Sequence, residues 1–325
     1  MSNDIFALVE HLDGKISEVS FELLGKGREL ASVTGGRLCA VLLGSGVKPL
    51  ATELGAADSV LVMEHAALAA YTPEAYTRAL RALVEARAPR AFLTSSTAIG
   101  MDQSAGLSAG LGWPLAAYAK DLSLKGATLK AVSQIYGGKI LAETELPGDH
   151  AIVALLAGAS PAEKGRAAKG PTVEEVAAPA GLETVRTRFK RLIVPEAGDV
   201  DITKEAILVS VGRGIQSQDN LALALELAEA LGASVSASRP IIDQGWLPKT
   251  RQVGKSGMTV KPKLYLAVGI SGAPEHLEGM RGAATIVAIN TDAAAPIFGA
   301  AHYGAVADLF DVLPLLTEKV KAARA

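Results

Sequence analysis

Residues Gln252–His276 read QVGKSGMTVKPKLYLAVGISGAPEH, and they decide the fold of the second half of the chain. The stretch begins with a loop rich in small residues. The apolar run Leu264–Val268 follows and empties into a second small-residue turn, Gly269–Ala273, before Pro274 starts a helix-like segment that carries His276. A buried strand that leads through a glycine-rich turn into a helix N-terminus is the local pattern of a phosphate- or cofactor-binding crossover.

The same alternation of apolar runs and amphipathic helices surrounds this stretch. Expected strands are Ala206–Val211, Ser234–Ala237, Thr285–Ile289 and Ala305–Phe310, and expected helices are Asp219–Leu231 and Val312–Ala323, the last with Pro314 in its first turn. The alternation predicts a mostly parallel sheet with right-handed crossovers. We therefore expect a Rossmann-like parallel-sheet domain.

The N-terminal half alternates in a similar way. Strands are expected over Ile5–Glu10, Leu38–Leu43, Ser59–Met63, Ala91–Thr94 and His150–Leu156, and helices over Glu22–Val33, Val47–Leu54 and from Pro73 to Ala86. Thr128–Tyr136 and Lys139–Leu146, joined by Gly137-Gly138, read as a β-hairpin. The expected fold is an α/β sheet domain with an antiparallel edge.

A change of composition marks the boundary between the two halves. Residues 157–203 are polar and rich in proline and glycine, although Val173 and its neighbours have the character of extended chain. Such a segment is typical of an interdomain connector. We expect an N-terminal domain over 1–190, a connector over about 158–203, and a second domain over 204–325.

Composition excludes several classes of function. The chain has 325 residues, a formal net charge of −2 and no dense lysine or arginine face, which argues against nucleic acid as a partner. The single cysteine, Cys39, lies in an apolar run, and the five histidines lack metal-ligand spacing, so neither a disulfide nor a metal site is expected. No apolar run is long enough for a membrane helix and no leader is apparent, so we expect a soluble, cytoplasmic protein.

Polar residues follow each expected strand of the second half. Arg213 stands between Gly212 and Gly214, where Ser217 occupies the place of a third fingerprint glycine; further along come Ser238-Arg239, Asn290 and Asp308. Taken singly, each is explained as an ordinary turn, cap or surface residue. The carboxyl ends of parallel strands meet at one edge, so together these loop tips favour one large ligand with phosphate, hydroxyl and heteroaromatic parts.

The N-terminal half offers no comparable set. Ser95-Ser96-Thr97 and Asp102-Gln103-Ser104 are interpreted as caps of the helix that follows, and no Ser/His/Asp arrangement is apparent.

At these residues the sequence resembles the α subunits of electron transfer flavoproteins. The resemblance rests on motifs that extend in order from Ala206 to the C-terminus: Gly212-Arg213-Gly214, Ala237-Ser238-Arg239-Pro240, Gln252–Gly257, Val260–Tyr265, Gly269–Ala273, His276-Leu277, Gly279-Met280, Ile286–Asn290, Ala295–Phe298 and Tyr303–Phe310. The first half resembles the family's first domain more loosely.

The resemblance implies a heterodimer with a β subunit, contacted by the N-terminal domain, and an FAD held by the C-terminal domain. It implies an electron carrier between dehydrogenases of the acyl-CoA type or related ones and a quinone reductase or another acceptor, through a stabilised anionic flavin semiquinone. The implied FAD-binding residues are Arg213, Ser238, Arg239, Gln252, Val253, Gly254, Lys255, Ser256, Gly257, Ser271, Gly272, Ala273, Pro274, Glu275, His276, Asn290, Asp308 and Leu309.

Three of these residues have implied roles at the flavin ring. Arg239 would lie over the isoalloxazine, Ser256 near N5, and His276 near the N1/O2 edge, where reduction places negative charge that cationic and donor groups stabilise. Glu275 departs from the glutamine that is common in the family. A carboxylate there raises the histidine pKa, lowers the flavin potential or faces solvent; the sequence leaves these three open.

Other classes remain open at this point. A nicotinamide-dependent dehydrogenase of the same fold lacks the third glycine and an acidic ribose ligand, and a non-redox nucleotide-binding module would purify colourless. Within the carriers, the alternative to simple transfer is a component of a flavin-based, NADH-dependent bifurcating complex. We expect a carrier rather than a stand-alone enzyme.

Overall fold

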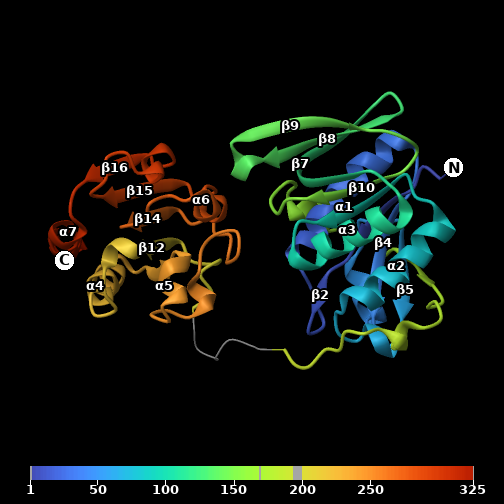
Figure 1. Ribbon diagram of the computed structural model, residues 1–325, viewed down its shortest axis with the longest axis horizontal. Coiled ribbons are helices and arrows are strands. Elements are labelled where there is room, and N and C mark those ends of the chain that lie inside the picture. Colours follow the sequence, from blue (N-terminus) through green and yellow to red (C-terminus); the bar gives the residue numbers. More distant parts are fainter. Residues whose placement is uncertain (1, 168–169, 193–199, 325) are drawn as a thin grey trace. The chain divides into compact units, whose positions relative to one another are not determined.

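The computed structural model describes residues 2–167, 170–192 and 200–324. The chain divides into two compact units, Met1–Arg191 and Leu192–Ala325, and each is a layered α/β structure (Figure 1). This agrees with the two-domain α/β fold expected from the sequence.

The N-terminal unit is built on a nine-stranded sheet with the order β11-β5-β4-β1-β6-β10-β7-β8-β9. Its strands are β1 (Ile5–Leu8), β4 (Leu38–Gly44), β5 (Ser59–Glu64), β6 (Ala91–Ser95), β7 (Leu115–Lys125), β8 (Thr128–Ile135), β9 (Ile140–Leu146), β10 (Ala151–Leu155) and β11 (Thr172–Glu175). Six neighbouring pairs are parallel, whereas β8 is antiparallel to both β7 and β9. The expected antiparallel edge is thereby confirmed. A small hairpin, β2 (His11–Leu12) and β3 (Lys15–Ile16), follows β1.

Helices cover both faces of this sheet. The helices of the unit are α1 (Glu18–Thr34), α2 (Pro73–Arg87) and α3 (Ala98–Leu111), with 3₁₀ turns η1 (Lys48–Glu53), η2 (Ala66–Leu68), η3 (Tyr136–Gly138), η4 (Ala162–Gly165) and η5 (Leu182–Thr184). One core contains Phe21 and Leu24 of α1, and the other contains Leu80 and Leu83 of α2. Pro73 stands in the first helical turn as expected, and Gly35 ends α1 with a φ of 69°.

Two strands of this sheet were not expected. β7 carries a register shift between Ala119 and Asp121 and a positive φ of 53° at Tyr118, so its apolar residues do not alternate regularly. The four-residue β11 lies inside the expected connector and pairs with β5. Within the described part of residues 157–203, Leu182 is also fully buried against the N-terminal core.

The C-terminal unit contains a five-stranded, wholly parallel sheet with the order β13-β12-β14-β15-β16. Its strands are β12 (Ile207–Val211), β13 (Ser234–Ala237), β14 (Leu264–Val268), β15 (Thr285–Asn290) and β16 (Tyr303–Val306). The helices are α4 (Leu221–Leu231), α5 (Arg239–Asp243), α6 (Pro274–Met280) and α7 (Leu309–Arg324), with 3₁₀ turns η6 (Arg213–Ile215), η7 (Lys249–Arg251) and η8 (Pro296–Gly299).

The two faces of this sheet are covered differently. Residues of α4, α5 and α7 form one core with alternate strand positions. The other face packs against Val253 and Val260 of the long loop, Leu277 and Met280 of α6, and Ile297 of η8. The predicted Rossmann-like sheet is therefore present, with a loop and the short helix α6 in place of a long helix on one face.

The last strand and the last helix have other bounds than the sequence predicted. The last strand is Tyr303–Val306, not Ala305–Phe310, because Leu309 and Phe310 already belong to α7. Pro314 consequently lies inside this helix rather than in its first turn, where it removes an N–H that would bond the Phe310 carbonyl.

Candidate functional site

The carboxyl ends of the five parallel strands converge on one edge of the C-terminal sheet. They lead into the loop tips that carry the predicted site residues Arg213, Ser238, Ser271, Asn290 and Asp308. The chain proceeds from β12 outward to β13 and then returns to β14 on the other side of β12. This reversal is a topological switch point, where α/β sheets bind their ligands.

Glycines let the two central loops meet at this switch point. The Gly212 N–H donates to the Val268 carbonyl at 2.9 Å, and the Gly214 N–H donates to the Gly269 carbonyl at 3.0 Å. A Cβ on Gly212 would lie 2.3 Å from the Gly269 carbonyl oxygen, and one on Gly214 would lie 2.7 Å from the Gly269 Cα. The contact is therefore restricted to glycine, and the two backbones form a floor without side chains.

The loop of residues 252–258, at the start of the stretch Gln252–His276, packs on α6. The Lys255 N–H donates to the Glu275 carbonyl at 2.7 Å, and the Val260 N–H donates to the Gly279 carbonyl at 2.8 Å. Gly254 has a φ of 135°, and a Cβ there would lie 2.8 Å from the Glu275 carbonyl oxygen. The loop and the helix that carries His276 are thus fixed to each other through their backbones.

Ser256 is exposed, and its orientation is set by Gln252. The buried Gln252 side chain donates from Nε2 to Ser256 Oγ at 2.8 Å. A hydroxyl that accepts this bond keeps its own proton for another acceptor. Ser256 is therefore oriented as a hydrogen-bond donor toward its exposed side.

Two arginines border the edge. Arg213 follows β12 and Arg239 begins α5, and both side chains are exposed. Arg239 Nε lies 3.2 Å from Asp243 Oδ2, an exposed pair that contributes little to stability but limits where the guanidinium points.

Asn290 and Asp308 make local hydrogen bonds. Asn290 Nδ2 donates to the Ile270 carbonyl at 2.9 Å and ties the end of β15 to the turn after β14. Asp308 Oδ1 accepts from the Phe310 N–H at 2.9 Å at the start of α7. Both residues therefore shape the loops of the edge, as caps and turn residues do.

The predicted site residues differ in exposure. Ser238, Gln252, Val253, Gly254, Gly272, His276 and Leu309 are buried; Gly257, Pro274 and Asn290 are intermediate; and Arg213, Arg239, Lys255, Ser256, Ser271, Ala273, Glu275 and Asp308 are exposed.

His276 is the buried titratable group of this site. Its Nε2 lies 2.9 Å from the hydroxyl of Tyr265, which is fully buried in β14. Burial lowers the pKa of His276 to about 4, and the Val253 backbone carbonyl opposes that effect in part. Among the described residues, no group makes a hydrogen bond with His276 Nδ1. Glu275, the neighbouring carboxylate, is exposed.

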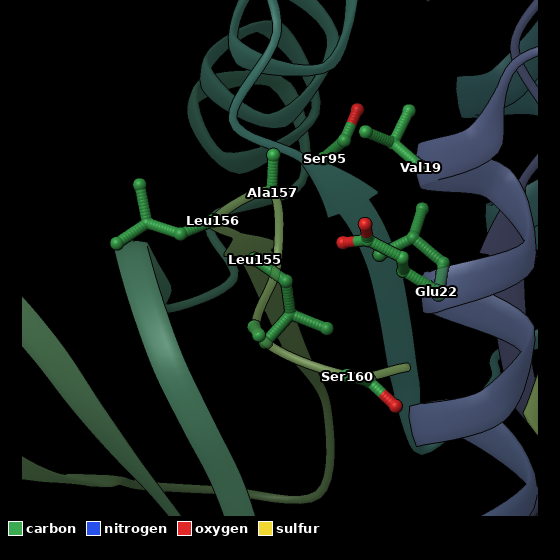
Figure 2. Close-up of a pocket in the computed structure, with 9 residues that line it drawn as sticks. Val19, Glu22, Ser95, Leu155, Leu156, Ala157 and Ser160 are labelled. Atoms are coloured by element: carbon green, nitrogen blue, oxygen red, sulfur yellow. The ribbon is translucent and has the colours of Figure 1, made fainter. Parts of the chain in front are cut away.

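The carboxyl ends of the parallel strands in the N-terminal sheet carry a different set of residues from those of the C-terminal sheet. Figure 2 shows the residues that line a pocket between α1 and the ends of β6 and β10, with Ser95, Glu22 and Ser160 among mainly apolar neighbours. Glu22 Oε2 already accepts from the Gly158 N–H at 2.5 Å. Thr97 Oγ1 accepts from the Gly100 N–H at 3.0 Å, which confirms its interpretation as a helix cap.

Glu10 at the end of β1 was not singled out from the sequence. It is 7% exposed, and its Oε1 accepts hydrogen bonds from the hydroxyls of Ser95 and Thr97 (2.7 Å). Burial raises the pKa of Glu10, and the two hydroxyls lower it in part. A buried carboxylate at this position disfavours an anionic ligand, so the C-terminal edge is the stronger candidate.

A parallel sheet whose central loops meet through glycines at the switch point defines the class of α/β proteins that bind nucleotide-type cofactors. Within that class, residues 5–180 match the model of the electron transfer flavoprotein domain, and residues 201–281 match that of the electron transfer flavoprotein FAD-binding domain. The chain belongs to the family of electron transfer flavoprotein α subunits, and FAD is its cofactor.

Relatives of known name span almost the whole chain. The electron transfer flavoprotein subunit alpha of Mycobacterium leprae is 38% identical over 325 residues, which cover 99% of each chain. That of Bacillus subtilis is 37% identical over 99% of this chain and 98% of its own. The acryloyl-CoA reductase electron transfer subunit beta of Anaerotignum propionicum is 34% identical over 99% of this chain and 96% of its own.

The described residues contain neither a candidate membrane span nor a candidate metal site. Over residues 2–167, 170–192 and 200–324, no helix is long and apolar enough to span a membrane. In the same described residues, no group of three or more His, Cys, Asp or Glu side chains is placed to hold a metal ion.

Proposed function

We propose that the FAD lies along the carboxyl edge of the C-terminal sheet and that the chain carries electrons through it. The observation that supports this location most strongly is the glycine floor of Gly212, Gly214 and Gly269, where an added Cβ would collide with backbone. This close contact holds the loops that follow β12 and β14 together at the switch point, where α/β sheets bind their ligands. The orphaned Nδ1 of His276 adds an unsatisfied polar atom beside the same edge.

Three side chains would act on the flavin ring. When bound, FAD supplies the one-electron chemistry of the carrier. Ser256, held by Gln252, presents its hydroxyl proton for the ring N5. Arg239 places positive charge beside the ring, and His276 adds a neutral imidazole at the N1/O2 edge. Arg239 is the one of the three that carries a full charge, which Asp243 at 3.2 Å offsets in part, so we expect it to contribute most to the flavin potential.

Partners are assigned at the level of the family. The α subunits of electron transfer flavoproteins pair with a β subunit. We infer that the N-terminal domain, residues 1–190, supplies most of that contact and that the donors are acyl-CoA-type or related dehydrogenases, since one relative is named for acryloyl-CoA reductase. A quinone reductase is the acceptor we favour. Counting flavins per α/β pair, with an assay for reduction by NADH, separates this carrier from a bifurcating complex.

The electrostatic assignment is tested with Arg239→Ala in the complex with the β subunit. We expect a more negative potential for the first electron, measured by potentiometry in preparations that hold equal FAD. Arg281→Ala, at the C-terminal end of α6, is the matched control and leaves the potential unchanged. An unshifted potential in FAD-replete Arg239→Ala would rule out the charge assignment.

A further inference from the structure

The side chain of His276 points into the C-terminal unit. The residue is 6% exposed, and its Nε2 lies 2.9 Å from the hydroxyl of Tyr265, which is fully buried in β14. Ala273 and Glu275, at the start of the same helix α6, are exposed. The imidazole thus lies inside a turn whose neighbouring residues reach the surface at the carboxyl edge of the sheet.

The proton order between the two rings follows from the hydrogen bonds. The Tyr265 hydroxyl donates to the hydroxyl oxygen of Ser210 in β12 at 2.7 Å. Burial raises the pKa of Tyr265 far above its usual value, so the phenol is neutral and has this one proton. Its oxygen therefore accepts from His276, and Nε2 carries the N–H of the neutral imidazole.

The other ring nitrogen of His276, Nδ1, is a buried acceptor. Among the described residues, no group makes a hydrogen bond with it. A buried acceptor without a partner costs at least as much free energy as one hydrogen bond between neutral groups contributes. The bond to Tyr265 and the unpaired Nδ1 therefore act against each other, and the inward position of the imidazole is held only weakly.

This inward position leaves His276 without a donor for a ligand. A neutral imidazole has a single N–H, and here Tyr265 accepts it. N1 and O2 of a flavin ring are acceptors, so a histidine beside them must bring an N–H. Turning the imidazole about its Cα–Cβ and Cβ–Cγ bonds would free Nε2–H and expose Nδ1 to water, while the phenol keeps its donation to Ser210.

We propose that His276 is a donor with two positions: Tyr265 retains it inside the unit when FAD is absent, and FAD binding turns it outward. Its Nε2–H then exchanges the phenol oxygen for the N1/O2 edge of the flavin. The inference rests on the proposed function, which places that edge beside His276. Tyr265 is accordingly a positioning residue that opposes FAD binding by the free energy of one hydrogen bond, because that bond must break.

The first test locates the imidazole in solution. Full-length chain labelled with ¹⁵N-histidine is studied by NMR in its complex with the β subunit, and His276→Gln identifies the signal. Without FAD we expect the proton on Nε2 and a nuclear Overhauser effect between that proton and the Tyr265 ring. With FAD this effect is expected to vanish. A contact that persists in the FAD-loaded complex, or a proton on Nδ1 without FAD, overturns the proposal.

The second test is the sign of a change in FAD affinity. Tyr265→Phe keeps the ring and removes the acceptor that retains His276, so we expect FAD to bind about two- to tenfold more tightly. The donor to Ser210 is lost with and without FAD, so that loss cancels. Tyr76→Phe is the matched control with unchanged affinity, because Tyr76 is a buried tyrosine of the other unit whose hydroxyl bonds the Leu68 carbonyl. Equal or weaker FAD binding by folded Tyr265→Phe overturns the proposal.

The same spectra separate this proposal from the one on which it rests. If the His276 signal does not respond to FAD, the proposed location of the cofactor fails, and this inference fails with it. If the signal responds to FAD while the contact with Tyr265 persists, the location stands and only the outward turn is lost. Loss of the contact, together with tighter binding by Tyr265→Phe, supports both.

Discussion

Burial shifts the pKa values of two titratable residues in opposite directions: it lowers that of His276 and raises that of Glu10. His276 is held neutral by burial in the C-terminal unit. Burial raises the pKa of Glu10 in the N-terminal unit. Each unit contains one tryptophan, Trp113 in the first and Trp246 in the second, so unfolding of each unit is measurable separately by fluorescence.

For His276 we predict that stability increases with pH. Its folded pKa of about 4 lies below the ordinary histidine pKa of 6.5, so between these values the unfolded chain binds more protons and acidification favours unfolding. The effect is about 3 kcal/mol between pH 6.5 and 4. Urea unfolding of FAD-free Trp113→Phe protein, followed by Trp246 emission, should show this slope, and adding His276→Gln should flatten it. Equal slopes in the two proteins would contradict the burial of a neutral imidazole.

For Glu10 we predict the opposite sign. A folded pKa raised above the unfolded value gives stability that is present at low pH and is lost as pH rises through the folded pKa. Glu10→Gln keeps the acceptor oxygen for Ser95 and Thr97 and removes the charge. In a Trp246→Phe background, Trp113 emission should show a higher free energy of unfolding for Glu10→Gln at pH 7, with little difference at pH 4. A lower stability at pH 7 would show that the ionised carboxylate is needed.

For single residues, the sequence predicted which polar side chains follow the strands, but not the buried residues that form hydrogen bonds behind them. Arg213, Ser256 and His276 belong to motifs that can be read locally. Tyr265 looked like one apolar residue of a strand, and its contacts to Ser210 and His276 join residues that are 55 and 11 positions away. No local pattern reports such a pairing, and Glu10 was missed for the same reason, because its partner Ser95 lies 85 positions away.

At the scale of elements, strands with regular apolar runs were predicted and irregular ones were not. β13 and β14 have the predicted bounds because each is a buried run that ends at polar or glycine punctuation. β7 was missed because its bulge breaks the alternation, and β16 was misplaced because three of its four residues are exposed. Edge strands carry little of the hydrophobic signal on which sequence patterns depend.

The packing of the 252–258 loop on α6 gives an element-scale prediction. In Gly254→Ala the Cβ would contact the Glu275 carbonyl oxygen, so the loop must move away or be strained. Without FAD the loop can move and relieve this strain, whereas FAD binding requires the original loop position. A strain of about 1–3 kcal/mol in the bound state raises the FAD dissociation constant by roughly 5- to 150-fold. Titration of the FAD-stripped complex measures this. Gly299→Ala, where a Cβ meets open space, should bind FAD as the wild type does; equal affinity in Gly254→Ala would mean that the loop does not hold the cofactor.

At the scale of the whole molecule, the two units divide the work. The C-terminal unit holds the proposed FAD edge, and the N-terminal unit is proposed to hold the β subunit. Cross-linking mass spectrometry of the α/β complex should therefore place most links from the β subunit within residues 1–190. A set of links confined to residues 204–325 would refute this division.

The central claim is that FAD lies at the carboxyl edge of the C-terminal sheet, and hydrogen–deuterium exchange of the α/β complex with and without FAD tests it most directly. The account predicts slower exchange, when FAD is bound, in peptides that cover residues 252–258 and 269–276, with no change in peptides that cover residues 9–12 and 95–100 at the edge of the N-terminal sheet. Protection of those N-terminal peptides, with residues 252–258 and 269–276 exchanging as before, would contradict it.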